Sequence, residues 1–403
     1  MFDEIRFNRI DNLPKYVFSV INELKISLKA SGKEVIDFSM GNPDRDTPQH
    51  IVDELCKTAN EPGNHGYSPS QGIPEVLEAI TWWYGDRYGV KLDPKTQAVA
   101  TIGSKDGYSH LAYAITNPGD TAVVPTPTYP IHSYSFILAG GVVEDLKLKF
   151  DENYNVDENH FFDELNHIFD KAHVKPKYVL VNFPHNPTSA TVTPQFYKNL
   201  VALAKKRRFY IISDIAYGDI SFGGYRTPSI MEIDGACDVA VESFTVSKSY
   251  NMAGWRIGFF VGNKKLISAL VKLKSWLDYG MFAPIQKATV EALTGDQSCV
   301  DEITTRYNDR QNLLIQEYAK IGWHIRKNKA SMFSWAKIPK EVAHMGSLEF
   351  CQKLLLQEQV AFSPGAGFGD DGEGFVRIAL IQNDEKIKLS AKKIENFIKN
   401  NKR

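Results

Sequence analysis

The sequence predicts an α/β protein in which a mainly parallel sheet is covered by helices and joined to a smaller α+β domain. Three observations support this. Short apolar runs alternate with helical patterns between about residues 98 and 262, and longer helices with only two strand-like pieces follow. The chain has 403 residues, enough for two unequal domains. We expect an N-terminal arm and part of the small domain in 1–44, a large domain in 45–285 and a small C-terminal domain in 286–403.

The predicted strands of the large domain are apolar along their whole length. Such runs are typical of parallel strands, which are buried on both faces. Helical patterns at about 105–116, 130–139 and 194–207 lie between several of them, as in a sheet covered by helices. The six runs are Ala98–Ile102, Thr121–Val124, Tyr178–Val181, Phe209–Ile212, Asp238–Val241 and Ile257–Val261.

The smaller domain is predicted from the residues after 262. A long helix is expected first, with one apolar face formed by Leu266, Leu270, Leu273 and Leu277. Further helical patterns follow at about 284–320, 347–358 and 384–402, and strand-like pieces lie at 331–335 and 375–380.

Composition limits the partners of the protein. Its 47 basic and 48 acidic residues create no net field that would attract nucleic acid or an anionic membrane, so small molecules are the expected partners. The four cysteines form no C-x-x-C pair, and we expect neither disulfides nor a metal site. No apolar stretch approaches the roughly 20 residues of a membrane span, and the N-terminus lacks the apolar core of a signal peptide. We expect a cytoplasmic protein.

Several predicted strands end in residues with complementary chemistry. In parallel sheets, ligands bind beyond the carboxyl ends of the strands. Asp214 and Tyr217 follow one run, Asn186 lies in the turn after another, and Lys248 follows a third with Arg256 eight residues beyond. The loop 103–107 leads from a strand into a helix, whose N-terminal N–H groups and dipole favour a phosphate.

Taken singly, each of these signals has an ordinary structural explanation. Asp214 would be a helix cap, Asn186-Pro a turn, and Lys248 a surface lysine. Together they supply a lysine for covalent attachment, an acid for a pyridine nitrogen and donors for a phosphate, which are the requirements of pyridoxal 5′-phosphate. The glycine-rich stretch 365–374 resembles a dinucleotide fingerprint but opens no helix and carries acids, so we expect a loop there.

These segments resemble the class I/II aminotransferases, which have the fold of the type I pyridoxal-phosphate enzymes. The resemblance covers nearly the whole chain and is carried by Phe38-Ser-Met-Gly-Asn-Pro43, by Thr245-Val-Ser-Lys-Ser-Tyr-Asn-Met-Ala-Gly-Trp-Arg-Ile-Gly258 and by Phe375-Val-Arg377. Within the family the chain is similar to the bacterial glutamate–pyruvate (alanine) transaminases. One departure is Thr245, where the family often has Ser or Gly.

The resemblance implies a role for each candidate residue. Lys248 would bond covalently to the cofactor, Asp214 would pair with its pyridine nitrogen, and Arg377 would bind the substrate α-carboxylate. Tyr129 would stack on the ring, and Tyr67 would reach the phosphate from the second subunit of a homodimer. The other implied contacts are Asn186 and Tyr217 with the ring oxygen, Ser104, Lys105 (through its backbone), Thr245, Ser247 and Arg256 with the phosphate, and Tyr16, Gly41 and Asn186 with the substrate.

The expected reaction is a ping-pong transfer of the amino group from alanine to 2-oxoglutarate, which yields pyruvate and glutamate. Aspartate aminotransferase is the main alternative. A pyridoxal-phosphate lyase would use the same cofactor site, and keto-acid formation without an amino acceptor would identify it. A regulator built on this fold usually carries a DNA-binding domain ahead of it. Because the resemblance begins within the first 16 residues, we expect no such domain here.

Overall fold

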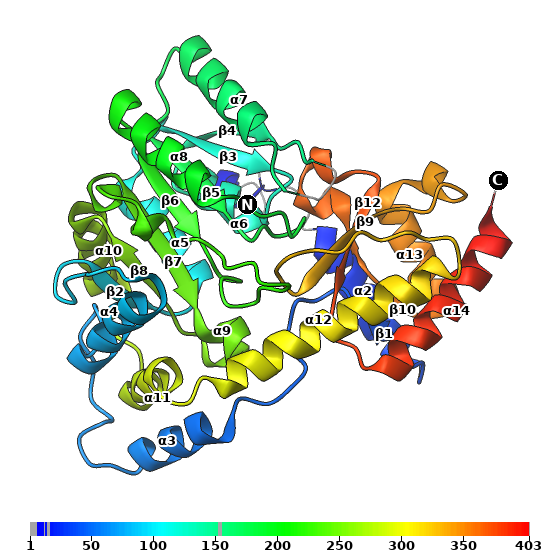
Figure 1. Ribbon diagram of the computed structural model, residues 1–403, viewed down its shortest axis with the longest axis horizontal. Helices are drawn as coiled ribbons and strands as arrows, with labels where there is room; N and C mark the ends of the chain where they lie inside the picture. The colour runs from blue at the N-terminus through cyan, green and yellow to red at the C-terminus, as the bar shows by residue number, and fades with distance from the viewer. Residues whose placement is uncertain (1–5, 12, 14–16, 152–154, 403) are drawn as a thin grey trace.

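A seven-stranded sheet forms the centre of the larger of two units (Figure 1). The computed structural model describes residues 6–11, 13, 17–151 and 155–402. Within them the large sheet lies between residues 98 and 262. In spatial order its strands are β2 (Ala98–Thr101), β8 (Gly258–Gly262), β7 (Ala240–Thr245), β6 (Tyr210–Asp214), β5 (Tyr178–Asn182), β3 (Thr121–Thr126) and β4 (Val142–Lys147).

The strands are parallel to one another except β8, which is antiparallel to both of its neighbours. A parallel crossover needs a dozen or more residues, usually with a helix that packs back along the sheet. The connection from β7 to β8 contains only the short helices α9 (Val246–Ser249) and η3 (Ala253–Trp255), so β8 returns antiparallel. The predicted mainly parallel sheet is confirmed.

Helices cover both faces of this sheet (Figure 1). One face packs against α5, α6 and α10, and the opposite face packs against α4, α7, α8 and α11. Their bounds, with that of the neighbouring α3, are α3 (Gln49–Ala59), α4 (Pro74–Tyr88), α5 (Ser104–Ile115), α6 (Pro130–Leu138), α7 (Glu158–Lys171), α8 (Pro194–Arg207), α10 (Lys264–Leu277) and α11 (Ala283–Thr294).

The smaller unit has its own buried core, built from two small sheets and four helices. β1 (Ile36–Asp37) pairs in parallel with β10 (Val360–Ala361), so the N-terminal part of the chain completes the C-terminal unit. The remaining elements are the antiparallel sheet β11 (Ser363–Pro364), β12 (Phe375–Ala379) and β9 (Phe333–Lys337), and the helices α2 (Val17–Ala30), α12 (Ser298–Ala319), α13 (Gly346–Glu358) and α14 (Asp384–Asn401).

Helix α12 joins the two units. It runs from the larger unit into the smaller one in Figure 1, and its Val300 packs in the first core while Ile303 packs in the second. The domain limits at residues 44 and 285 stay a prediction. The remaining short elements are α1 (Asn8–Asp11), η1 (Ile230–Glu232), η2 (Ala236–Asp238), η4 (Ala343–Met345), η5 (Gly365–Phe368) and η6 (Asp370–Gly372).

Two local predictions were wrong, and one strand was not predicted. The helical range 284–320 is two helices, because α11 ends at Thr294, Gly295 after it is extended, and the Asp296 side chain accepts the Ser298 N–H at the start of α12. In α10, Leu277 is exposed, and the buried face instead includes Ile267 and Lys274. The strand β4 was missed because most of its residues are exposed at the sheet edge and form no apolar run.

Other local predictions were confirmed. The stretch 365–374 forms the short helices η5 and η6 and opens no α-helix. Helix α8 has the predicted bounds, with Pro194 at its first position and the Thr193 side chain as its cap. In the part of the chain described here, no helix has both the length and the apolar character of a membrane span.

Candidate active site

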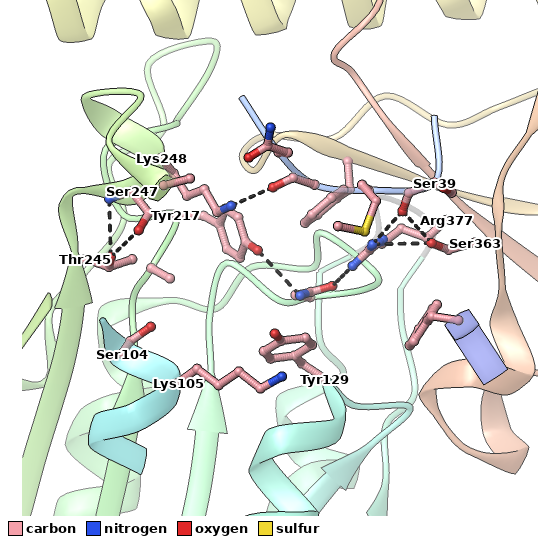
Figure 2. A pocket seen from close by; sticks show the side chains of 18 of the residues that line it. Ser39, Ser104, Lys105, Tyr129, Tyr217, Thr245, Ser247, Lys248, Ser363 and Arg377 are labelled. Carbon is pink, nitrogen blue, oxygen red and sulfur yellow. Dashed lines mark hydrogen bonds between the residues drawn. The ribbon is translucent and has the colours of Figure 1, made fainter. Parts of the chain in front are cut away.

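A cavity of about 590 Å³ lies between the two units, at the carboxyl ends of the large sheet. Figure 2 shows Ser104, Thr245 and Ser247 at one end, Arg377 with Ser39 and Ser363 at the other, and Lys248, Tyr217 and Tyr129 between them. The predicted site residues that line it are Gly41, Ser104, Lys105, Tyr129, Asn186, Asp214, Tyr217, Thr245, Ser247, Lys248, Arg256 and Arg377.

Two predicted residues are not among them. Tyr67 does not line the cavity of this chain: its side chain is 91% exposed, and its ring centroid lies 5.1 Å from that of Tyr279. Tyr16 lies outside the described residues.

Lys248 projects into the cavity from the short helix α9. Its Nζ donates to the Gly41 carbonyl at 2.5 Å. Burial lowers the pKa of Lys248 to about 8, and the positive charges of Arg377 and Arg256 act in the same direction. The neutral amine, which is the nucleophilic form, is therefore available close to neutral pH.

Asp214 is held at both carboxylate oxygens. Oδ1 accepts the Ala216 N–H at 2.9 Å, and Oδ2 lies 2.9 Å from Nε2 of the fully buried His132. With Nε2 donating, the Nδ1 of His132 can accept from the Thr128 hydroxyl at 3.3 Å. Sequence reasoning missed His132, although it lies just beyond the end of β3, where the search for site residues could have found it.

A polar row connects the middle of the cavity to its far end. The Asn186 side chain donates from Nδ2 to the Tyr217 hydroxyl at 3.4 Å, and its Oδ1 accepts from Arg377 Nη1 at 2.8 Å. The Asn182 side chain accepts the Asn186 N–H at 2.9 Å, which orients the turn. Burial raises the pKa of Tyr217, so its hydroxyl remains a donor across the physiological range.

Arg377 lies against two aromatic rings. Its guanidinium carbon is 4.2 Å from the centroid of Phe333 and 4.8 Å from that of Phe368. Nη2 donates to the Ser39 carbonyl at 3.0 Å. A Cβ on Gly41 would lie 2.6 Å from Phe333, so only glycine allows the chain to pass this close to the ring. Sequence reasoning did not identify Phe333, Phe368 or Ser39, because their sequence context gives no sign that they meet Arg377.

The opposite end of the cavity presents donors and positive charge to an anion. The helix α5 begins there at Ser104, and Ser247 and Arg256 face the same region. A Cβ on Gly103, whose φ is +78°, would lie 2.4 Å from Arg256 Nη2, so a glycine is needed for the guanidinium to pack over the loop. Free N–H groups, hydroxyls and a guanidinium together fit a phosphate.

The Thr245 hydroxyl has a structural task. It lies 2.9 Å from the Ile257 carbonyl and accepts the Ser247 N–H at 3.2 Å, so it caps α9. Threonine at this position therefore connects the two strands that flank Lys248 and orients Ser247.

The geometry describes a site for a phosphate-bearing cofactor with a reactive lysine, and the comparisons with known proteins agree. The family model for class I and II aminotransferases matches residues 33–394. The chain belongs to this family, whose members depend on pyridoxal 5′-phosphate, and its substrates are therefore amino acids and 2-oxo acids.

Individual relatives refine the comparison. The chain is 50% identical to the glutamate-pyruvate aminotransferase AlaC of Escherichia coli, a match covering 97% of this chain and 93% of the relative. It is 40% identical to an LL-diaminopimelate aminotransferase of Dehalococcoides mccartyi, covering 96% and 98%. The substrate-bound structure of BacF from Bacillus subtilis has a TM-score of 0.90 with 32% identity, covering 98% of each chain. The predicted fold and enzyme class are confirmed.

Proposed function

We propose that this aminotransferase transfers the amino group of alanine to 2-oxoglutarate, giving pyruvate and glutamate. The observation that carries the enzymatic part is a cavity in which Lys248 stands between an anion-binding end and Arg377. The choice of substrates is supported by the 50% identity to a glutamate-pyruvate aminotransferase. Both half-reactions would use the same cavity in turn, so the kinetics are expected to be ping-pong.

The residues fit pyridoxal phosphate at each of its polar groups. Ser104, Ser247, Arg256 and the N–H groups that open α5, including that of Lys105, would hold the phosphate, with Thr245 orienting Ser247. Asp214 would face the pyridine nitrogen, and its bond to His132 would keep the carboxylate aimed at the ring. The remaining contacts would be Asn186 and Tyr217 at the ring oxygen and Tyr129 against the ring face.

The bound cofactor supplies an electron sink for the bond that breaks at the substrate Cα. The chain does the rest. Arg377 would bind the α-carboxylate through its planar donor groups, which orients Cα toward Lys248. Lys248, with its lowered pKa, would hold the cofactor and would then accept and return the Cα proton as a neutral amine. Gly41 and the buried rings of Phe333 and Phe368 would keep water away from Arg377.

A second cation is needed, because glutamate and 2-oxoglutarate carry a distal carboxylate that alanine lacks. Among the cavity residues, Lys25 is paired with Asp37, and Lys248, Arg256 and Arg377 have the roles given above. Lys105 is exposed, and its side chain extends along the cavity toward Tyr129 in Figure 2. We therefore assign the distal carboxylate to the Lys105 ammonium, while its backbone serves the phosphate.

The substrate assignment is tested by a comparison of amino donors. Purified, cofactor-saturated enzyme would be assayed with alanine, aspartate and LL-diaminopimelate against 2-oxoglutarate, since relatives with the last activity reach 40% identity. We expect the highest kcat/KM for alanine. A clear preference for aspartate or LL-diaminopimelate would overturn the alanine assignment and leave the aminotransferase assignment intact. Keto-acid formation without any acceptor would instead indicate a lyase.

We also propose that the protein is a homodimer with shared active sites and that it is located in the cytoplasm. Tyr67 and Trp276 are 91% and 82% exposed, and Tyr67 does not line the cavity of its own chain. Large exposed aromatic side chains of this kind favour a protein partner, and in a symmetric dimer Tyr67 would reach the partner's phosphate. Sedimentation at assay concentrations should give a dimer, and Tyr67→Phe should retain cofactor less well. A fully active monomer would contradict the proposal.

A further inference from the structure

Lys25 is a buried cation on the wall of the cavity formed by α2. Its side chain is 7% exposed, and Nζ lies 2.8 Å from Asp37 Oδ2 and 3.0 Å from Ser39 Oγ. Phe18 and Asn22 of the same helix also line the cavity. A buried ammonium is stable only when it is paired and hydrogen-bonded, and Asp37 provides the pair.

The partner of Lys25 in turn fixes Ser39. Asp37 Oδ1 accepts the Ser39 N–H at 2.9 Å and its hydroxyl at 2.6 Å. Burial alone would raise the pKa of Asp37, but the bonds from Lys25 and Ser39 outweigh it and the pKa is lowered. Asp37 is therefore a charged acceptor that holds the backbone and the side chain of Ser39 in one orientation.

The carbonyl of Ser39 contacts Arg377 and Ser363. It accepts from Arg377 Nη2 at 3.0 Å and from the Ser363 hydroxyl at 2.6 Å. Arg377 donates from Nη1 to Asn186 and from Nη2 to both the Ser39 carbonyl and, at 3.3 Å, the Ser363 hydroxyl, with aromatic rings nearby. The Ser39 carbonyl accepts both from the guanidinium and from the hydroxyl that also contacts it, so its direction helps to set the plane of the guanidinium.

We infer that Lys25 is a positioning residue for substrate binding, which acts through Asp37 and Ser39 to orient the Arg377 guanidinium toward the α-carboxylate. Because α2 lines the cavity, Lys25, Asp37 and Ser39 link the position of this helix to the binding of the α-carboxylate. The inference rests on the proposed role of Arg377. Removal of the ammonium would leave the half-buried Asp37 carboxylate without its cation, and the turn at Ser39 would have to adjust to it.

The test compares Lys25→Met, which keeps the apolar stem, with Lys25→Arg, which restores the charge. Lys29→Met is the matched control, since Lys29 is exposed one turn further along α2. Each cofactor-loaded variant would be titrated calorimetrically with propionate, which has the carbon skeleton of alanine without its amino group. In parallel, kcat and KM for alanine, cofactor retention and Tm would be measured.

Lys25→Met should raise the propionate Kd and the alanine KM by about five- to tenfold, the size of one misplaced hydrogen bond. Its kcat should stay within about twofold, because the change affects binding rather than the reacting atoms. Lys25→Arg should recover most of the affinity, and Lys29→Met should behave as wild type. A loss of Tm with unchanged propionate affinity would overturn the inference.

Two further variants keep the result decisive. If Lys25→Met does not fold, Ser39→Ala removes only the hydroxyl between Lys25 and Asp37 and should still weaken propionate binding, and an unchanged Kd there would also refute the inference. Arg377→Ala separates the two hypotheses. If it leaves propionate binding intact, the assignment of Arg377 fails. If it weakens binding while Lys25→Met and Ser39→Ala do not, only the positioning role fails.

Discussion

The Arg377→Ala variant should have a lower kcat/KM than the wild type, by a similar factor for every amino donor. The guanidinium is buried, donates to Asn186 at 2.8 Å and to Ser39 at 3.0 Å, and lies 4.2 Å from the Phe333 ring centroid. It is therefore already oriented before the substrate arrives, and little side-chain entropy is lost on binding. All amino acids present the same α-carboxylate to it.

The magnitude follows from the kind of contact. A hydrogen bond to a charged group contributes about 1.5 to 3 kcal/mol, which corresponds to roughly a tenfold to somewhat over a hundredfold loss of kcat/KM. The kcat/KM of Arg377→Lys should fall between those of Arg377→Ala and the wild type, because a lysine ammonium keeps the charge but cannot reproduce the planar guanidinium. Asn186 and Ser39 lose their donor in Arg377→Ala, so Tm should be recorded with each variant.

The assay is kcat/KM for alanine, glutamate and aspartate with purified, cofactor-saturated enzyme. The ratios among donors should change by less than about threefold in Arg377→Ala, since the lost contact is common to all of them. Lys105→Met is the comparison variant. It should lower kcat/KM for glutamate and 2-oxoglutarate and leave kcat/KM for alanine unchanged. A loss of less than threefold for alanine, or a loss confined to the dicarboxylates, would refute the assignment of Arg377.

The remaining predictions concern buried ionisable groups. Because the pKa of Lys248 is lowered to about 8, the rate at which cofactor-free enzyme captures pyridoxal phosphate should rise with pH, with a midpoint near pH 8. Borohydride reduction should attach the cofactor to Lys248. A midpoint above pH 10, or labelling of another lysine, would contradict the assignment. Asp214→Asn should lower kcat far more than cofactor occupancy, since a nearby carboxylate favours the protonated pyridine ring; normal turnover would assign that role to another acid. Burial raises the pKa of Glu242 from 4.5 to about 7, so the folded state binds the proton more tightly than the unfolded state. Its contribution to stability is present below pH 4.5 and is lost as pH rises through 7, a change of roughly 3 kcal/mol at 1.36 kcal/mol per pKa unit. Glu242→Gln should remove that pH dependence, and parallel unfolding profiles of the two proteins would disprove it.

The sequence by itself determined which residues follow the buried strands. Apolar runs mark these strands because burial on both faces excludes polar side chains, and the polar residues after each run therefore stand out. Asp214, Asn186 and Lys248 were found in this way, and the structure brings them to one edge of the large sheet. The order of these local signals also carried the family resemblance.

Only the tertiary structure decided which distant residues meet. Arg377 contacts Asn186 and Ser39, which lie 191 and 338 positions away in the sequence, and a repeating apolar pattern reports burial without naming the partner. For the same reason the sequence did not predict the contacts of His132 with Asp214, of Phe333 with Gly41, or of Lys25 with Ser39. The reversed direction of β8 and the break between α11 and α12 likewise depend on how short connections pack, which hydrophobic periodicity along one segment does not encode.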